Sequence, residues 1–226
     1  MNKNYLMLKE IKSIQKRPDG IFGSFMTRTV SHVFVLAAYK LHLSPNMVSF
    51  LSLLLCTAGG ILLLLSQEKI YVISAIACWW LGAIFDAADG DLARFSKTGT
   101  PFGGWFDSFL DRLKEFFIFS VFGYLAWKHY NNDLFLLLGI ISVFSNVISG
   151  YISDTKKLFI SEKRNPEIVF SKKYSFGMVD TRDFIIILSL ILGDMRIPLC
   201  IYGILFPIIV FLQVYRFTFK YGLKKS

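Results

Sequence analysis

The sequence predicts an all-α integral membrane protein with six transmembrane helices, preceded by a cytosolic amphipathic juxtamembrane helix. Of the 226 residues, 54% are hydrophobic, and the mean hydropathy is +0.52. The apolar residues fall in long runs instead of alternating with polar ones, a pattern typical of membrane-spanning helices. We therefore expect a cytosolic segment at residues 1–44 and one transmembrane domain at residues 45–226.

Six apolar runs have, or nearly have, the ~20 residues that a helix needs to cross the hydrocarbon layer. The fifth run has a short apolar core and needs its flanks to reach that length. In chain order, the predicted spans are 47–66, 70–94, 102–127, 134–153, 183–193 with flanks, and 198–215.

The basic residues indicate that both termini lie in the cytosol. Lys and Arg concentrate before the first span, between the fourth and fifth spans, and in the C-terminal tail, whereas the alternate loops hold only Lys69, Lys128 and Arg196. Cytosolic loops carry such an excess of basic residues. The net charge of +9 follows from this topology and from attraction to anionic lipid, so we expect membrane lipid and no nucleic acid as a partner.

The N-terminal region divides into a polar stretch and a mixed stretch. Residues 1–20 lack the apolar segment that a cleavable signal peptide requires. Residues 21–43 combine apolar side chains with Arg28, His32 and Lys40, which favours an amphipathic helix on the cytosolic face. An ordinary juxtamembrane anchor without a catalytic part is the alternative. Ser44-Pro45 then opens the first span, because Pro is tolerated at the start of a helix.

Two pairs of aspartates interrupt the second and third spans. A carboxylate in the middle of a span costs about 2.5 to 3.5 kcal/mol, so Asp86, Asp89, Asp107 and Asp111 need a compensating cation. Helical spacing places each pair on one stripe, and the short connection at 95–101 makes the two helices antiparallel neighbours. The sequence therefore predicts an oxygen-ligand site for divalent metal, which the helical rise places near the cytosolic boundary.

Small residues share these stripes. Gly90, Ala93 and Gly103 would leave a groove in which a bulky polar ligand lies against the backbone. Arg94 ends the stripe, and its guanidinium suits the oxygens of a diphosphate. The alternative is that the small residues only allow helix packing and that Arg94 neutralises an aspartate. Asp91 lies off the stripe and is interpreted as a solvated interfacial charge.

The spacing Asp86-x2-Asp89-Gly90-x2-Ala93-Arg94-x8-Gly103-x3-Asp107-x3-Asp111 resembles the complete signature of the CDP-alcohol phosphotransferase family. That resemblance implies six transmembrane helices behind an amphipathic helix, and a homodimer. It also implies the reaction, in which the hydroxyl of an acceptor alcohol displaces CMP from a CDP-linked donor.

The resemblance also implies a role for each matching residue. Asp86, Asp89 and Asp107 resemble the main ligands of two divalent ions, Mg²⁺ or Mn²⁺. Asp111 resembles the general base and a further ligand of the second ion. The positions that face the nucleotide and the diphosphate correspond to Gly90, Ala93, Gly103 and Arg94.

Short segments around Asp19-Gly20, Arg28–Ser31, 102–112 and 181–183 are similar to the inositol-phosphate branch of the family. This similarity implies an enzyme like the phosphatidylinositol phosphate synthases or like the CDP-inositol:inositol-phosphate transferases. The alternatives within the family are CDP-choline, CDP-ethanolamine, phosphatidylglycerol-phosphate and phosphatidylserine enzymes. Arg182 and Lys156 are candidates for binding an acceptor phosphate, although the positive-inside rule alone also explains basic residues there.

Two other classes place carboxylates within a membrane. A polyprenyl-type transferase would show two separated Asp-rich motifs and more spans. A transporter or proton relay would need neither the stripe of small residues nor Arg94, and its activity would follow an ion gradient.

Overall fold

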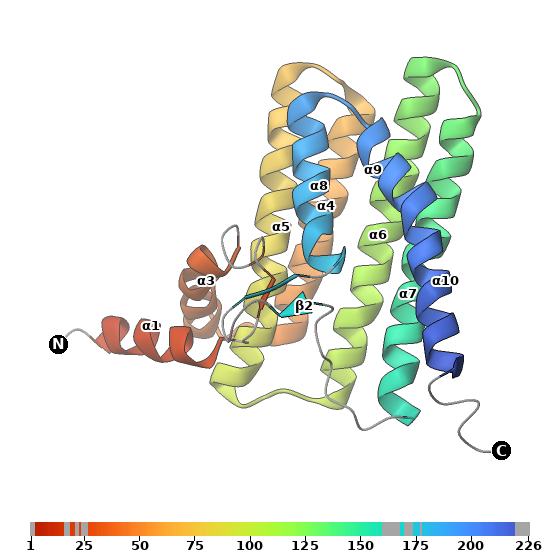
Figure 1. Cartoon of the computed structure of the whole chain (residues 1–226). Helices are drawn as coiled ribbons and strands as arrows, with labels where there is room; N and C mark the ends of the chain where they lie inside the picture. The colour runs from red at the N-terminus through yellow and green to blue at the C-terminus, as the bar shows by residue number, and fades with distance from the viewer. Residues whose placement is uncertain are drawn as a thin grey trace. The chain divides into compact units, whose positions relative to one another are not determined.

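The computed structural model describes residues 3–15, 19–20, 23, 27–159, 168–169, 174–176 and 178–219 (Figure 1). The chain divides into two units. Unit 1 comprises residues 1–114 and 165–188, and unit 2 comprises residues 115–164 and 189–226. Helix α6 (Pro101–Tyr130) begins in unit 1 and ends in unit 2.

Unit 1 is built on an antiparallel pair, α4 (Pro45–Leu65) and α5 (Lys69–Ser96). Ser44 caps α4 by accepting a hydrogen bond from the backbone N–H of Met47 at 3.3 Å, as the Ser-Pro start predicts. Glycine permits close packing of the two helices, because a Cβ added at Gly82 would lie 2.5 Å from Cys56 Sγ. This close approach packs α5 against α4 at Gly82.

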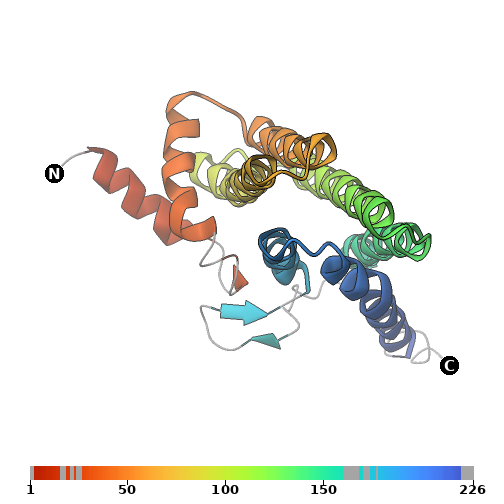
Figure 2. The same ribbon diagram turned by 90° about the horizontal axis from the view of Figure 1, so that it is seen from above.

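Two further helices pack against α5, namely α1 (Lys3–Ile14) and α3 (Thr29–Lys40) (Figure 2). Ile11 and Val35 are fully buried in a cluster that includes Leu92 of α5. The helix α3 lies within the range 21–43 where an amphipathic helix was expected, and its place on the cytosolic face stays a prediction. The helix α1 was not expected from the polar stretch at 1–20, and Ile11 ties it to the core.

A small sheet accompanies these helices in unit 1. The strand β3 (Tyr174–Phe176) pairs in parallel with β1 (Asp19–Gly20) and antiparallel with β2 (Ile168–Val169). Asp19 is in register with Tyr174. These strands were not anticipated from the sequence, and they attach the chain before α3 to the chain before α8 (Met178–Leu192).

Unit 2 contains the second half of α6 and α7 (Leu134–Phe159), which meet at glycines. A Cβ added at Gly139 would lie 3.0 Å from the Cα of Gly123, so only glycine allows this approach. A continuous helical stretch packs against α7. It consists of α9 (Arg196–Cys200), the π-helix η2 (Ile201–Leu205) and α10 (Phe206–Phe217).

Among the described residues, four helical segments are long and apolar enough to cross a membrane. They are Pro45–Leu65, Lys69–Ser96, Leu134–Ser153 and Arg196–Phe217. These segments coincide with the first, second, fourth and sixth predicted spans. The prediction of a helical multi-pass membrane protein is confirmed at this level.

Candidate active site

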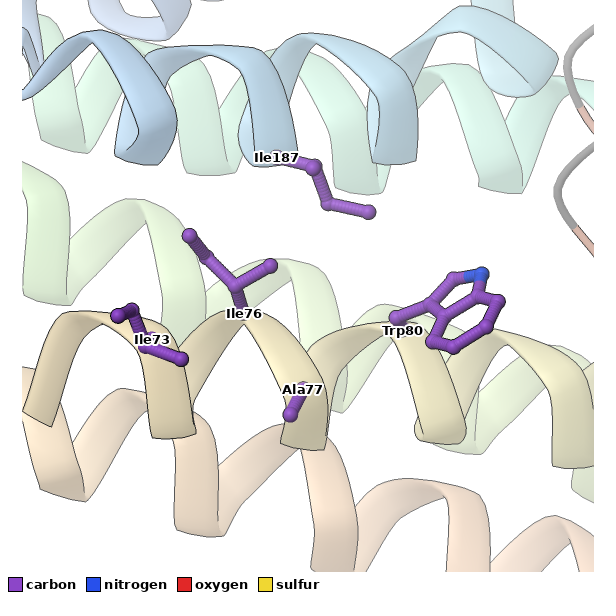
Figure 3. A pocket seen from close by; sticks show the side chains of 5 residues that line it. All are labelled: Ile73, Ile76, Ala77, Trp80 and Ile187. Carbon is purple, nitrogen blue, oxygen red and sulfur yellow. The ribbon is translucent and has the colours of Figure 1, made fainter. Parts of the chain in front are cut away.

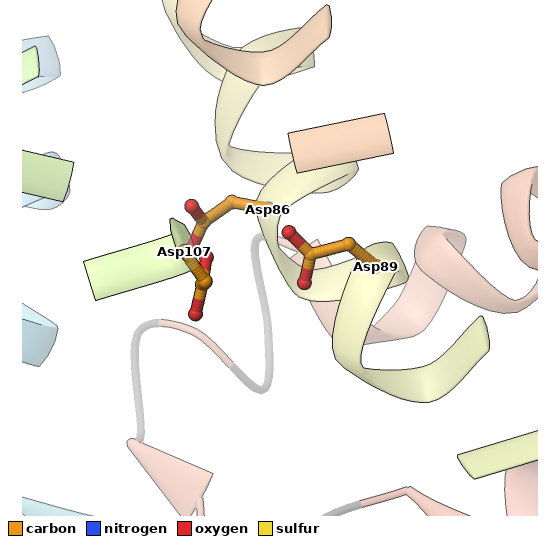
Figure 4. A group of neighbouring side chains, drawn as sticks. All are labelled: Asp86, Asp89 and Asp107. Carbon is orange, nitrogen blue, oxygen red and sulfur yellow. The ribbon is translucent and has the colours of Figure 1, made fainter. Parts of the chain in front are cut away.

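Three carboxylates converge between α5 and α6 in unit 1 (Figure 4). Asp86 and Asp89 project from α5, Asp107 projects from α6, and one oxygen of each lies within 4.8 Å of the others. A tight reversal links the helices. Lys97 ends α5 with φ of 57°, and Thr100 Oγ1 accepts a hydrogen bond from the N–H of Gly103 at 3.0 Å in the first turn of α6. The predicted convergence of these three side chains is therefore observed.

Ser49 of α4 forms a hydrogen bond to one carboxylate of the cluster. Its hydroxyl donates a hydrogen bond to Asp89 Oδ2 at 2.5 Å, and both side chains are buried. Ser49 was not predicted from the sequence, because the contact joins positions 40 apart in the chain.

Lys114 is a second residue of the site that was not predicted from the sequence. Its ammonium contacts Asp86 Oδ1, lies 2.8 Å from Asp111 Oδ1, and donates to Ser52 Oγ at 3.3 Å. The side chain is buried, with only 5% of its surface exposed. A signal was present in the sequence, since 107, 111 and 114 share one face of a helix at i, i+4 and i+7. Lys114 therefore links Asp111 to Asp86 of the cluster by pairing with both carboxylates.

A small polar cavity of about 10 Å³ borders the cluster. Arg182 is buried at this cavity, and its Nε lies 3.2 Å from Asp183 Oδ1. Trp79 is also buried there, and its Nε1–H has no hydrogen-bond partner among the described residues. The full lining is Ser52, Cys56, Trp79, Ala83, Asp86, Lys114, Arg182 and Asp183. The sequence candidate Arg182 thus lies beside Asp86 and Lys114.

The small residues of the stripe differ in their surroundings. The three atoms nearest to a Cβ added at Gly90 all belong to the Arg94 guanidinium, the first at 3.6 Å, so this Cβ would contact a flexible side chain at an ordinary van der Waals distance. At Gly103, the same atom would lie 3.2 Å from Asn46 Oδ1 and 3.3 Å from Thr100 Oγ1. Ala93 is half-buried on the same face of α5.

The expectation that Asp91 is a solvated interfacial charge is wrong. The side chain is fully buried. Arg28 Nη1 donates to Asp91 Oδ2 at 2.8 Å and also to the carbonyl oxygen of Ala87 at 2.8 Å, and Arg94 pairs with Asp91 Oδ1. Arg94 therefore neutralises an aspartate in this structure, as the alternative interpretation held, while 40% of its side chain stays exposed.

The other candidate for acceptor binding, Lys156, lies in α7 of unit 2. Its side chain is outside the described part of the structure, as are the basic residues Lys172 and Lys173.

An apolar pocket of about 310 Å³ lies elsewhere in unit 1, between α5 and α8 (Figure 3). Its lining is Ile73, Ile76, Ala77, Trp80 and Ile187. These side chains offer no group for acid, base or metal chemistry, and the pocket suits hydrocarbon.

The three converging carboxylates fit a hard divalent cation. Carboxylate oxygens are the ligands that Mg²⁺ and Mn²⁺ prefer, and Asp89 is buried where an unbalanced charge would be unfavourable. Their arrangement on neighbouring helices defines a membrane protein with a cluster of three carboxylates between two helices.

The sequence comparison identifies the family. Residues 42–215 match the family model described as CDP-alcohol phosphatidyltransferase. The chain belongs to this family, whose members are transferases, and the predicted membership of the family is confirmed.

Two curated relatives share the name "Bifunctional IPC transferase and DIPP synthase". The protein of Aquifex aeolicus is 26% identical over 221 residues, covering 97% of this chain and 48% of the relative. That of Archaeoglobus fulgidus is 26% identical over 192 residues, covering 83% of this chain and 36% of the relative. The chain therefore spans half or less of the length of these relatives.

A solved structure has the same fold. The crystal structure of Mycobacterium tuberculosis phosphatidylinositol phosphate synthase with CDP-DAG bound superposes with a TM-score of 0.62. It covers 83% of this chain and 91% of the other, at 16% sequence identity.

Proposed function

We propose that this protein transfers a substituted phosphate group from a CDP-linked donor to the hydroxyl of an acceptor alcohol and releases CMP. The observation that carries the proposal is the convergence of Asp86, Asp89 and Asp107 within 4.8 Å, in a chain that matches the family over residues 42–215. The reaction serves the synthesis of phospholipids or other polar lipids.

Divalent metal belongs to this proposal. Asp86, Asp89 and Asp107 would hold Mg²⁺ or Mn²⁺, which when bound stabilises the negative charge that develops on the diphosphate. Family resemblance suggests two ions. Arg94 is exposed enough to exchange one Asp91 oxygen for a phosphate oxygen, because Arg28 also neutralises Asp91.

The face of the helix at Gly90, where the nearest atoms belong to the flexible Arg94 side chain, would receive the cytidine diphosphate, with Ala93 and Gly103 on the same side. A backbone without side chains allows a flat ligand to lie close to the helix. The proposal therefore assigns the nucleotide to the face formed by the end of α5 and the start of α6.

The transfer itself needs a base. The acceptor oxygen forms a bond to the distal phosphorus, the bond from that phosphorus to the bridging oxygen breaks, and CMP leaves with the electron pair. Asp111 would accept the proton of the acceptor hydroxyl, since its side chain is partly exposed and lies beside the cluster through Lys114. The ion pair with Lys114 holds the carboxylate in one orientation while it does so.

An acceptor that carries a phosphate, of the inositol-phosphate type, is the preferred substrate. The names of the two curated relatives and of the solved structure support this preference. Arg182 lies buried at the polar cavity beside Asp86 and would bind the acceptor phosphate, and Lys156 is a further candidate. The alternatives in the family are CDP-choline or CDP-ethanolamine enzymes and phosphatidylglycerol-phosphate or phosphatidylserine enzymes.

We further propose six spans with both termini in the cytosol and the carboxylates near the cytosolic face. The helix α6 has 30 residues and would be the third span, and the 15 residues of α8 with their flanks would be the fifth. Charged residues such as Asp107 and Lys114 lower the hydropathy of α6 because the site is built there. A homodimer is the expected assembly, from family resemblance.

The test is a product analysis. The purified chain in lipid nanodiscs, with Mg²⁺, is mixed with a panel of CDP donors and candidate alcohols, and released CMP and lipid products are followed by mass spectrometry. We expect CMP only when donor and acceptor are both present. Asp111→Asn should keep donor affinity but lose turnover, while Asp133→Asn, an exposed aspartate in the loop before α7, should match the wild type. Transport of an ion without consumption of any CDP donor would refute the proposal.

A further inference from the structure

We infer that this chain holds a single divalent cation, at Asp86, Asp89 and Asp107, and that the Lys114 ammonium takes the place of a second cation between Asp86 and Asp111. The inference rests on the proposed function, because it concerns the charges that balance the same carboxylates. It replaces the family expectation of two ions with one ion and one fixed side-chain charge.

The first observation is the set of partners around Lys114. The ammonium has three N–H donors, and it meets Asp86 Oδ1, Asp111 Oδ1 at 2.8 Å and Ser52 Oγ at 3.3 Å. All three partners of the ammonium are oxygens, and two of them belong to charged carboxylates. A positive charge thus already bridges the carboxylate of α5 and the second carboxylate of α6, as a metal ion would.

The second observation is confinement. Lys114 is 5% exposed, Ser52 is fully buried, and the neighbouring cavity of about 10 Å³ has room for about one water molecule. The ammonium therefore has no space into which to withdraw. A divalent ion bound between Asp86 and Asp111 would lie against it, and repulsion between the two cations is weakly screened at such a buried position.

The third observation is that the convergent carboxylates and the carboxylates paired with Lys114 are two different sets. The three carboxylates whose oxygens converge are Asp86, Asp89 and Asp107, and Asp111 is outside that set. Asp86 belongs to both sets, because a carboxylate has about four lone-pair sites and can accept from Lys114 while it binds an ion. Asp111 is left to the ammonium, which keeps its carboxylate ionised and therefore in the form that a base requires.

The experiment counts bound metal independently of turnover. The purified full-length chain in phosphatidylcholine nanodiscs is titrated with Mn²⁺ alone, and free Mn²⁺ is followed by electron paramagnetic resonance. Two ions in a shared site ~3.5 to 4 Å apart would give a spin-coupled spectrum at low temperature. We expect one Mn²⁺ per wild-type chain and no coupled signal.

Variants at Lys114 provide the decisive comparison. Lys114→Met removes the charge but keeps much of the length, so it should bind two Mn²⁺ per chain and show the coupled signal. Lys114→Arg keeps the charge and should bind one. Lys69→Met is the matched control, because it removes an exposed lysine at the other end of α5, and it should also bind one.

Two results would overturn the inference. One is a wild-type chain with two coupled Mn²⁺ ions, which decides the matter even if Lys114→Met fails to fold. The other is a folded Lys114→Met chain that still binds a single ion. Both results concern only the number of bound ions. The proposed function would instead be refuted if no CDP donor released CMP in the product analysis.

Discussion

The hydroxyl of Ser49 lies 2.5 Å from Asp89 Oδ2 and joins α4 to the carboxylate cluster on α5. Both side chains are 5% exposed, so the hydrogen bond is protected from water. Groups behind a metal ligand fix its orientation and raise the affinity of the site. The cluster therefore depends on α4, a helix that contributes no carboxylate to it.

The first prediction concerns this hydrogen bond. Ser49→Ala should lower Mn²⁺ affinity by roughly 10- to 100-fold, because Asp89 loses the partner that orients it. Isothermal titration with Mn²⁺ measures the effect. Ser120→Ala is the control, since its exposed hydroxyl donates a hydrogen bond to the carbonyl oxygen of Phe116 in its own helix. An unchanged affinity in folded Ser49→Ala would mean that packing alone orients Asp89.

The second prediction concerns the carboxylates themselves. Asp86→Asn, Asp89→Asn and Asp107→Asn should each reduce transfer by on the order of 1000-fold or more, because each keeps the shape but removes a charged ligand. Chelation by EDTA should abolish transfer, and added Mg²⁺ or Mn²⁺ should restore it in the wild type alone. Membrane insertion of each variant is checked by its yield in detergent extracts. Near wild-type turnover of Asp89→Asn would refute the metal assignment.

Local spacing was sufficient to predict the convergence of Asp86, Asp89 and Asp107. The helical period aligns the first two on α5, and the short reversal after Ser96 brings α6 back beside them. The four long apolar helices were equally visible, because an uninterrupted hydrophobic run needs no tertiary information. Features that depend only on helix geometry were therefore predictable.

Features that depend on distant partners were not predictable. Asp91 points away from the stripe, and only the fold reveals that Arg28, 63 positions earlier, lies there. Ser49 and Ser52 look like ordinary small residues of an apolar span until α4 packs against the cluster. Lys114 had a local signal, but its pairing with Asp86 on another helix decides its role.

The third prediction separates ligand space from helix packing. Gly90→Leu should weaken CDP-donor binding by more than about 10-fold with little loss of thermal stability, because the nearest atoms to the added Cβ are those of the flexible Arg94 side chain, at an ordinary contact distance. Gly82→Leu is the contrasting variant, since its Cβ alone would overlap Cys56, and it should mainly lower the melting temperature. Donor titration and thermal unfolding in detergent measure both effects. Unchanged donor affinity with a large fall in melting temperature for Gly90→Leu would reverse the assignment of this face.

The fourth prediction tests the acceptor. Arg182 is buried at the polar cavity next to Asp86, and Asp183 lies 3.2 Å from its Nε. If the acceptor carries a phosphate, Arg182→Ala should raise the acceptor KM by roughly 10- to 100-fold, because a charge-assisted hydrogen bond contributes about 1.5 to 3 kcal/mol. Donor affinity should stay nearly constant, since the nucleotide is assigned to the Gly90 face.

Kinetics at varied acceptor concentration make this measurement, with Arg196→Ala as the matched control. Arg196 is exposed and pairs with Asp194 in the loop before α9, so its loss should leave both constants unchanged. Arg182→Lys provides a second comparison. It keeps the charge without the planar guanidinium, and it should recover only part of the acceptor affinity. An acceptor KM that does not change in Arg182→Ala, or a preferred acceptor without phosphate, would remove the phosphate role from Arg182 and favour a CDP-amino-alcohol enzyme.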